Sequence, residues 1–499
     1  MTSVIMDRVA IVPGGIMGVA SEELLAGVPP GREVAVTEVA RAVGQSERRL
    51  VVLDDDPTGT QTVAGLPVLT SWTEDDLRWA LRQPSAAFFI LTNSRSLAPA
   101  AMADLNREVV AALAAAARAE GARFVIASRS DSTLRGHYPQ ETDVIAAALA
   151  EYAGSPTDGV VLVPAYLDAG RVTVDSVHWM RGPDGFIPVG DSEFARDPAF
   201  GYASSDLRDW VAEKTGGRWR RDQVARITLA DIRVGGPERV AGILGGLAGG
   251  RPVVVDAVTD DDLRLVVLGA LRAEDAGAAL LYRVGPSFVR ARAGQAAAPP
   301  LTGAELAALG LAGQAGGRHG LVVVGSHVPR TTRQLDHLLA LDGVTRVELD
   351  VRAVLSPPTR DATVAAAAAA VVAGLAGADV ALCTSRELVA TAGADGNLEI
   401  ARTVSAALVD VVRRVTAQVT PGWIIGKGGI TSSDLATRGL ALTRAIARGT
   451  LLPGMVSLWD PVSAPGPVAD GQAPFVVFAG NVGDEDALAR TVERLRGSE

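Results

Sequence analysis

Residues 50–62 of the chain read Leu50-Val51-Val52-Leu53-Asp54-Asp55-Asp56-Pro57-Thr58-Gly59-Thr60-Gln61-Thr62 and indicate the class of fold. An apolar run ends directly in three carboxylates, and a turn rich in Pro, Thr and Gly follows. A continuous apolar run predicts a strand buried on both faces, as in a parallel sheet covered by helices. Ligands bind outside the carboxyl ends of such strands. Because an N-cap needs only one Asp, we interpret the three acids as a functional site rather than as a cap alone.

Similar apolar runs recur along the chain, and helical, Ala-rich stretches such as 102–120 and 404–419 separate them. This alternation predicts the α/β class, with two α/β domains that each hold a largely parallel sheet flanked by helices. The ten expected strands are 50–53, 87–91, 124–127, 160–163, 253–255, 280–284, 321–324, 380–383, 423–425 and 475–478.

The length of 499 residues favours two or three domains, and residues 291–320, rich in Ala, Gly and Pro, read as the connection between them. Residues 172–206 contain many Gly, Pro and charged residues and are expected to form a long functional loop. The predicted domains are an N-terminal extension at 1–47, a first domain at 48–295, a linker at 296–319 and a second domain at 320–499.

Composition narrows the class of protein. The net charge of −10, with no Lys/Arg cluster, argues against a general nucleic-acid binder. The single cysteine, Cys383, cannot form an internal disulfide, and the first residues do not resemble a signal peptide, so we expect a cytoplasmic protein. The Ala-rich stretch 362–378 is too short for a membrane span and is interpreted as a buried helix.

A second polar motif, Ser128–His137 (SRSDSTLRGH), follows the run FVIA. The arginine fork of Arg129 or Arg135 matches a carboxylate, and Asp131 could accept a proton or position a hydroxyl. A capped helix entry with surface ion pairs is the structural alternative.

A third motif, Gly422–Asp434 (GWIIGKGGITSSD), is expected to be a strand, a Gly-rich turn and a helix that continues through 435–446. Backbone amides at such a turn can bind phosphate. The spacing is not that of a Walker A motif. Lysine occurs only at Lys214 and Lys427, and Lys427 lies inside this turn, whereas Lys214 is interpreted as surface. Two more glycine turns, at 324–327 and 478–483, also follow predicted strands and fit one nucleotide site with it.

With these motifs assembled, the chain resembles the four-carbon acid sugar kinase family. The resemblance rests on LDDDPTGTQT (53–62), SDSTLRG (130–136), Gly170–Thr173 with the later EFARDP, and the second-domain stretches 325–334, 427–434 and 480–483. It implies that the first domain holds an acid sugar, that the second holds ATP with Mg²⁺, and that the active site lies in the cleft between the domains. The implied substrate-binding residues are Asp54, Thr58, Arg129, Ser132 and Arg135, the catalytic residues Asp55, Asp131 and Lys427, and the nucleotide-binding residues Ser326, Gly428, Gly429, Ile430, Thr431 and Gly480.

The resemblance implies phosphorylation of the terminal hydroxyl of threonate, erythronate or 3-oxo-tetronate. We expect Arg135 or Arg129 to grip the carboxylate, Asp55 or Asp131 to accept the proton, and Lys427 to offset the developing charge. The chain departs from shorter family members at Asp56, which precedes Pro57, so the substrate stays open within this class. No membrane or nucleic-acid partner is expected, and the oligomeric state, a homo-oligomer included, stays open.

Two rival functions stay open. The stretch Ile11–Gly18 imitates a dinucleotide fingerprint, although its glycine spacing is wrong, and it would suit an NAD-dependent acid-sugar dehydrogenase. Two α/β lobes would also suit a sugar-acid sensor without enzymatic activity.

Overall fold

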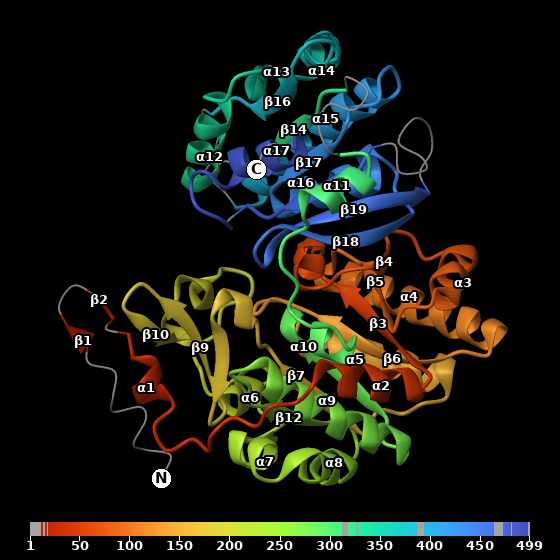
Figure 1. Ribbon diagram of the computed structural model, residues 1–499, viewed down its shortest axis with the longest axis vertical. Coiled ribbons are helices and arrows are strands. Elements are labelled where there is room, and N and C mark those ends of the chain that lie inside the picture. Colours follow the sequence, from red (N-terminus) through yellow and green to blue (C-terminus); the bar gives the residue numbers. More distant parts are fainter. Residues whose placement is uncertain are drawn as a thin grey trace. The chain divides into compact units, whose positions relative to one another are not determined.

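The computed structural model describes residues 11–12, 15–16, 18–311, 318–325, 328–386, 394–463, 473–480 and 482–497 of the chain (Figure 1). The contacts divide the chain into two units. The first comprises Met1–Asp55 and Trp72–Ala297, and the second comprises Asp56–Ser71 and Ala298–Glu499. The α/β class and the two-domain organisation predicted from the sequence are confirmed.

The first unit is built on a parallel sheet with the strand order β11-β12-β7-β13-β6-β3-β5. Three of its seven strands, β5, β7 and β13, are buried from end to end, and β3, β6 and β12 are buried except at their first one or two residues, which explains why their sequences are largely continuous apolar runs. The strands are β3 (Arg48–Asp54), β5 (Ala87–Leu91), β6 (Arg123–Arg129), β7 (Gly159–Val163), β11 (Ala225–Ile227), β12 (Arg251–Val255) and β13 (Leu280–Val284).

Helices connect these strands and pack against one another in pairs such as α4 with α5 and α8 with α9. The predicted N-terminal extension is part of this arrangement, because α2 packs against α9 and buries Val39 and Val43. The helices of the first unit are α1 (Ser21–Leu24), α2 (Val36–Gln45), α3 (Glu74–Arg82), α4 (Pro99–Glu120), α5 (Gln140–Ala153), α6 (Leu207–Lys214), α7 (Leu229–Arg233), α8 (Gly236–Gly245), α9 (Asp260–Asp275) and α10 (Pro286–Arg292).

The prediction that residues 172–206 form a long loop is wrong. Part of this region forms a small antiparallel sheet of order β10-β9-β8. The strands are β8 (Arg171–Val174), β9 (Val177–Gly182) and β10 (Gly185–Pro188). Asp175 and Ser176 both adopt positive φ in the two-residue turn between β8 and β9, a conformation typical of tight hairpins. Of the Gly and Pro residues that suggested a loop, Gly182, Gly185 and Pro188 lie at the ends of short strands, and the others lie in the segments that connect or follow these strands. At the N-terminus, β1 (Ile11–Val12) and β2 (Gly15–Ile16) form a separate antiparallel pair.

The strand order of the first sheet places a topological switch point between β3 and β6. The chain leaves β3 for β5 on one side and then returns to β6 on the other side of β3. The register pairs Asp54 with Leu91 on β5 and with Arg129 on β6, and Arg129 with Val284 on β13. The carboxyl ends of four strands thus lie in one row, which is where open α/β sheets bind ligands.

The second unit has a mixed sheet of order β4-β18-β19-β20-β17-β14-β16-β15. The five strands from β20 to β15 are parallel, whereas β4, β18 and β19 are antiparallel to their neighbours. The chain switches sides between β14 and β17. The strands are β4 (Leu66–Leu69), β14 (Leu321–Val324), β15 (Val344–Leu349), β16 (Asp379–Thr384), β17 (Ile424–Lys427), β18 (Arg444–Leu452), β19 (Met455–Ser463) and β20 (Phe475–Phe478).

Two predictions about this unit need correction. The helix expected through 435–446 ends early, because α16 passes into a π-helical turn at Leu435–Gly439 and Ala441 has a positive φ before β18 begins. The predicted linker is partly structured, because α11 carries a capping box at Thr302 and buries Leu306 in the core of the unit. The helices are α11 (Gly303–Ala308), α12 (Pro329–Leu339), α13 (Val351–Leu355), α14 (Pro357–Gly374), α15 (Ala394–Thr416), α16 (Gly429–Asp434) and α17 (Ala487–Leu495).

Residues 56–71 group with the second unit although they precede most of the first in sequence. Strand β4 pairs with β18, and the Thr60 hydroxyl lies 2.9 Å from both Ser457 Oγ and Trp459 Nε1. These contacts explain the grouping.

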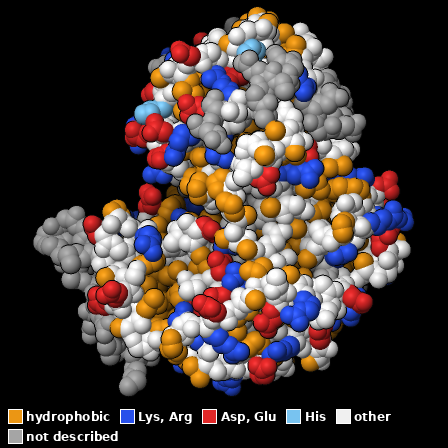
Figure 2. All heavy atoms as spheres, viewed as in Figure 1, with side chains coloured by type: hydrophobic (Ala, Val, Ile, Leu, Met, Phe, Trp, Pro, Cys, Tyr) orange, Lys and Arg blue, Asp and Glu red, His pale blue; other side chains and the backbone are white. Residues whose placement is uncertain are grey.

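The described helices include none that is long and apolar enough to cross a membrane. The Ala-rich stretch forms α14, which buries Val364, Ala367, Ala368 and Val371 as expected of a packed helix. Figure 2 shows basic and acidic side chains mixed over the visible face of each unit, with no large area of one sign. Cys383 is buried within β16.

Candidate functional site

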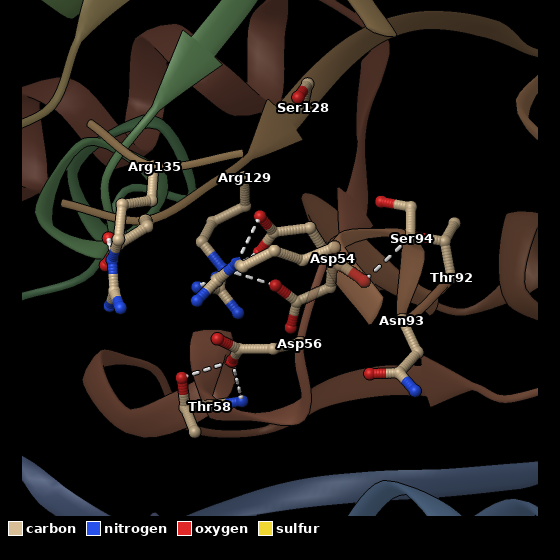
Figure 3. A network of polar contacts seen from close by, with 12 residues as sticks. Asp54, Asp56, Thr58, Thr92, Asn93, Ser94, Ser128, Arg129 and Arg135 are labelled. Atoms are coloured by element: carbon tan, nitrogen blue, oxygen red, sulfur yellow. Dashed lines mark hydrogen bonds and ion pairs between the residues drawn. The ribbon is translucent and has the colours of Figure 1, made fainter. Parts of the chain in front are cut away.

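The three acids of the opening motif have different roles in the structure. Asp54 and Asp55 are buried at the carboxyl end of β3. Arg129, at the end of β6, points toward Asp54 and donates from Nε to its Oδ1, as Figure 3 shows. Its Nη1 also lies 3.7 Å from Asp55 Oδ1. Burial of an unpaired charge is costly, so this arginine and these acids stabilise one another at the switch point.

Asp55 has a second and closer arginine partner. Arg95 follows β5 and donates to both carboxylate oxygens, from Nε to Oδ2 at 2.9 Å and from Nη2 to Oδ1 at 2.5 Å. Such bidentate pairing fixes both groups in one plane. The sequence analysis missed Arg95, although the polar run TNSRS directly after the predicted strand 87–91 was a usable signal.

Asp56 and Thr58 belong to the second unit and match the structural alternative considered for this motif. Asp56 is the N-cap of a short 3₁₀ helix at Pro57–Thr62, where its Oδ1 accepts the backbone N–H of Thr58 at 2.7 Å and the Thr58 hydroxyl (Figure 3). One acid of three therefore acts as a cap, as the capping argument requires. The predicted role of Thr58 in substrate binding stays a prediction.

The second motif forms a loop after β6 that carries Asp131 and Arg135. Arg135 Nε donates to Asp131 Oδ2 at 2.7 Å, and its Nη1 lies 3.6 Å from Asp197 Oδ2. Burial would raise the pKa of Asp131, but the charges of Arg95 and Arg135 outweigh it and lower the pKa. Asp131 is therefore ionised at neutral pH and partly exposed, as a proton acceptor must be.

Three backbone carbonyls of this loop are held by side chains from elsewhere in the first unit. His178 on β9 lies with Nε2 2.8 Å from the Ser132 carbonyl, and Nδ1 lies 2.9 Å from the Thr173 hydroxyl. Because a carbonyl only accepts, Nε2 carries the proton and Nδ1 accepts from Thr173. The other two contacts are Tyr202 Oη to Thr133 O at 2.6 Å and Arg283 Nη2 to Arg135 O at 3.3 Å.

Gly136 ends the loop with φ +118°, a conformation that favours glycine. A Cβ at this position would also lie 3.6 Å from Asp55 Oδ2 and 3.4 Å from Arg283 Nη2. Both distances are ordinary van der Waals contacts, so the positive φ rather than lack of space favours glycine here, and the loop backbone lies close to Asp55. The sequence analysis predicted Ser132 as a substrate-binding residue, and the structure places it in this loop, largely buried.

The buried carboxyl of Glu141 contacts the segments that follow β5 and end β6. Glu141 on α5 accepts from Ser94 Oγ at 3.0 Å and from Ser128 Oγ at 3.2 Å, and Arg283 Nη1 lies 3.5 Å away. Burial, together with the charge of Asp55, raises the pKa of Glu141. This network fixes the starts of both polar loops, after β5 and after β6.

In the second unit, three glycine turns lie at neighbouring strand ends. The register aligns Val324 of β14 with Lys427 of β17, and Lys427 with Phe478 of β20. The structure therefore brings Gly325, Gly428 and Gly480 to the carboxyl edge of one sheet, beside its switch point. A Cβ on Gly325 would lie 2.3 Å from Thr431 Oγ1, so only glycine allows α16 to approach β14 this closely. Ser326 lies outside the described residues.

Gly428 and Gly429 differ in what they tolerate. Gly428 is the N-cap of α16 with φ +120°, and its N–H donates to the Phe478 carbonyl at 2.8 Å. Gly429 opens the helix, and a Cβ there would meet open space. The next residue, Ile430, is 56% exposed, which is unusual for a large apolar side chain and leaves it accessible to a ligand.

Lys427, predicted to lie inside the glycine-rich turn, is the last residue of β17 and is fully buried. Its Nζ donates to the carbonyls of Ala479 at 2.7 Å and Gly480 at 3.3 Å and lies 4.0 Å from the centre of the Phe478 ring. Burial lowers the pKa of Lys427 to about 7, and the charge of Arg330 adds to this effect. The geometry makes Lys427 a support for the Gly480 turn.

Two side chains of helix α12 also hold the backbone at and after Gly480. Thr331 Oγ1 donates to the Gly480 carbonyl at 3.0 Å, and Gln334 Nε2 donates to the carbonyls of Val482 at 3.0 Å and Asp484 at 2.7 Å. Buried polar side chains thus hold the backbone after β20 in place.

No group of three or more His, Cys, Asp and Glu side chains in the described part of the chain could hold a metal ion. Mg²⁺ that arrives on a nucleotide needs only one or two carboxylates, because phosphate oxygens and water fill its other positions. The prediction of Mg²⁺ therefore stays open.

Comparisons with known proteins agree with this division of roles. Residues 50–292 match a family model described as a sugar-binding N-terminal domain, and residues 321–488 match a nucleotide-binding C-terminal domain. The chain belongs to the four-carbon acid sugar kinase family. None of the curated proteins searched matches it.

Two solved structures have a fold similar to that of this chain. A Salmonella typhimurium protein, provisionally described as a tRNA synthase, is 20% identical with a TM-score of 0.63, over 89% of this chain and 98% of its own. A Haemophilus influenzae protein from a domain family of unknown function is 18% identical with a TM-score of 0.56, over 88% of this chain and 98% of its own.

Proposed function

We propose that the protein is an ATP-dependent kinase that phosphorylates the terminal hydroxyl of a four-carbon acid sugar such as threonate, erythronate or 3-oxo-tetronate. The main support for the proposal is that one chain contains two candidate ligand sites of different chemistry, one in each unit. The first unit has an arginine and carboxylate site at the switch point of its sheet, within the sugar-binding match. The second has three glycine turns at its switch point, within the nucleotide-binding match.

In the first unit, carboxylates suit the hydroxyls of the substrate and arginines suit its acid group. The terminal hydroxyl attacks the γ-phosphorus of ATP, its proton passes to Asp131 or Asp55, and the bond from phosphorus to the ADP oxygen breaks. Asp131 is the better candidate because it is partly exposed, whereas Asp55 is buried and bidentate to Arg95.

In the second unit, the Gly428 N–H is donated to the Phe478 carbonyl, so the amide of Gly429 at the start of α16 would bind a phosphate oxygen. The exposed Ile430 would cover part of the nucleotide. Lys427 would act through the Gly480 turn that it holds, and its predicted catalytic role becomes one of positioning. Mg²⁺ bound to the nucleotide would neutralise phosphate charge.

An ADP-release assay tests the proposal. ATP and Mg²⁺ are incubated with the stereoisomers of threonate and erythronate and with 3-oxo-tetronate, and NAD⁺ reduction is followed in parallel. ADP formation that depends on one of these acids supports the kinase. NADH formation would favour the dehydrogenase, and stabilisation by an acid without turnover of either cofactor would favour the sensor.

A further inference from the structure

The arginines that the sequence analysis expected to grip the substrate are already engaged by acids of the protein. Arg129 is paired with Asp54, and Arg135 is paired with Asp131 and lies near Asp197. Arg135 also stacks over the Phe194 ring at 4.9 Å. Releasing either arginine to a substrate would leave a largely buried carboxylate without its partner, which is costly.

Arg171, at the start of β8, differs from these arginines. Its Nη1 makes a single long contact of 3.4 Å to the Ala169 carbonyl, and its Nε is buried with no hydrogen-bond partner among the described residues. None of the described carboxylates lies within 4.0 Å of its guanidinium. Arginine has five N–H donors in a fixed fork, so most of its donors are unused.

The backbone holds Arg171 firmly in this position. Arg171 and Tyr166 exchange two backbone hydrogen bonds, at 2.9 and 3.1 Å, and the guanidinium lies over the Tyr166 ring at 5.8 Å from its centre. The preceding Gly170 has φ +67°, and a Cβ there would lie 2.6 Å from Arg181 Cβ.

Strand β8, which begins at Arg171, is linked to the motif loop by hydrogen bonds: the Thr173 hydroxyl contacts His178 Nδ1 at 2.9 Å, and His178 Nε2 contacts the Ser132 carbonyl at 2.8 Å. Burial lowers the pKa of Arg171, and the like charge of Arg135 adds to this effect, against the opposing influence of Asp131 and Tyr166. The buried Nε without a hydrogen-bond partner costs free energy, and an anionic ligand with two oxygens would satisfy the fork and offset the repulsion between Arg171 and Arg135.

We propose that Arg171 is the residue that binds the carboxylate of the acid substrate, whereas Arg129 and Arg135 position the acids of the site. The inference rests on the proposed function for the identity of the acid. On this inference, Arg171 makes the site selective for an acid sugar over a neutral polyol, because a neutral ligand would leave the Arg171 guanidinium without an anionic partner.

The experiment compares Arg171→Gln and Arg171→Lys with Arg220→Gln, a control at an exposed pair with Asp222. Isothermal titration calorimetry measures binding of threonate, erythronate and the neutral erythritol to the full chain, and kinetics give the Michaelis constants. We expect Arg171→Gln to weaken acid binding by about 10- to 150-fold, as for loss of a charge-assisted pair. Arg171→Lys, which keeps the charge but not the fork, should weaken it less, and the ATP constant should not change.

Unchanged acid binding in Arg171→Gln would overturn the inference, and so would an equal loss for erythritol. If Arg171→Gln does not fold, native acid affinity in Arg171→Lys overturns it, because that variant lacks the fork. If the wild-type protein binds an acid but forms no ADP, the kinase fails while the loss in Arg171→Gln still supports the anion site. If it binds none of the acids, both proposals fail.

Discussion

At the switch point of the first unit, the strand ends carry charged side chains, whereas at the switch point of the second unit the corresponding places are taken by glycines. Asp54 and Arg129 are paired across β3 and β6. Gly325 and Gly428 follow the paired strands β14 and β17. A ligand at the sheet edge of the first unit would therefore meet charged side chains. A ligand at the sheet edge of the second unit would meet backbone that no Cβ covers.

This difference determines how each site should respond to mutation. In the first unit, a change of charge at constant shape should alter chemistry or selectivity with little effect on the backbone. In the second, the chemistry lies in the backbone, so added bulk or loss of a backbone support should matter most.

Asp131→Asn should lower turnover by about 10²–10⁴-fold, the usual contribution of a general base. The substitution preserves shape and removes both the proton acceptor and the charge paired with Arg135, so the melting temperature should fall, and circular dichroism checks that the variant is folded when kcat is measured. Asp55→Asn serves as the companion variant, and Asp222→Asn, at an exposed site, is the control. Near-native kcat in both site variants would show that neither acid accepts the proton.

Lys427→Met should raise the Michaelis constant for ATP by about tenfold, since the carbonyls of Ala479 and Gly480 lose their donor. The stability profile should change too. In the unfolded chain this amine titrates at its ordinary pKa of 10.5, whereas in the folded chain its pKa is about 7. Between these values the unfolded state binds more protons, so stability rises with pH.

Melting temperatures of wild type and Lys427→Met between pH 7 and 9 measure this effect. The wild type should gain stability relative to the variant as the pH rises. If the melting temperatures of both proteins change with pH in the same way and the kinetic constants are unchanged, Lys427 neither titrates as stated nor supports the nucleotide site.

Gly429→Val should raise the Michaelis constant for ATP several-fold and leave that for the acid unchanged, because its Cβ points into open space where phosphate is expected. The melting temperature should stay within about 2 °C. Gly428→Ala is the matched control for strain, because φ +120° at Gly428 should cost about 1–3 kcal/mol. Equal kinetic constants in Gly429→Val and wild type would mean that this turn does not bind the nucleotide.

His178 should make the first unit sensitive to acid. Burial lowers the pKa of His178 to about 4 from its ordinary 6.5. Between these values the unfolded chain binds the proton and the folded chain does not, so stability falls as the pH decreases from 6.5 to 4. His178→Gln should flatten this part of the melting profile, and an unchanged slope would contradict the assigned neutral imidazole.

Much of the fold was predictable because buried parallel strands are continuous apolar runs. Each of the ten predicted strands overlaps an observed one, four of them with the same bounds: 87–91, 280–284, 321–324 and 475–478. Strands with mixed composition were missed, such as β18 and β19, which the sequence analysis placed partly in a helix or left unassigned. Their identity depends on pairing with β4 and β20, a long-range contact that no local pattern reveals.

The positions of the site residues were predictable from strand ends, but their partners were not. Sequence shows that Arg129 and Arg135 follow a strand; it does not show that both are occupied by acids while Arg171 is not. Likewise, the glycines around Lys427 predicted that it lies inside a turn, whereas the strand continues through it and buries its side chain. Charge pairing and burial arise only when distant segments fold together.

Hydrogen exchange of the full chain with each ligand alone tests the central claim, that the two units hold different ligands. A non-hydrolysable ATP analogue should protect amides at 428–432 and leave 129–136 unchanged, and threonate or erythronate should protect 129–136 and 171–174 and leave 428–432 unchanged. Protection of 129–136 by the nucleotide, or of 428–432 by the acid, would contradict the account.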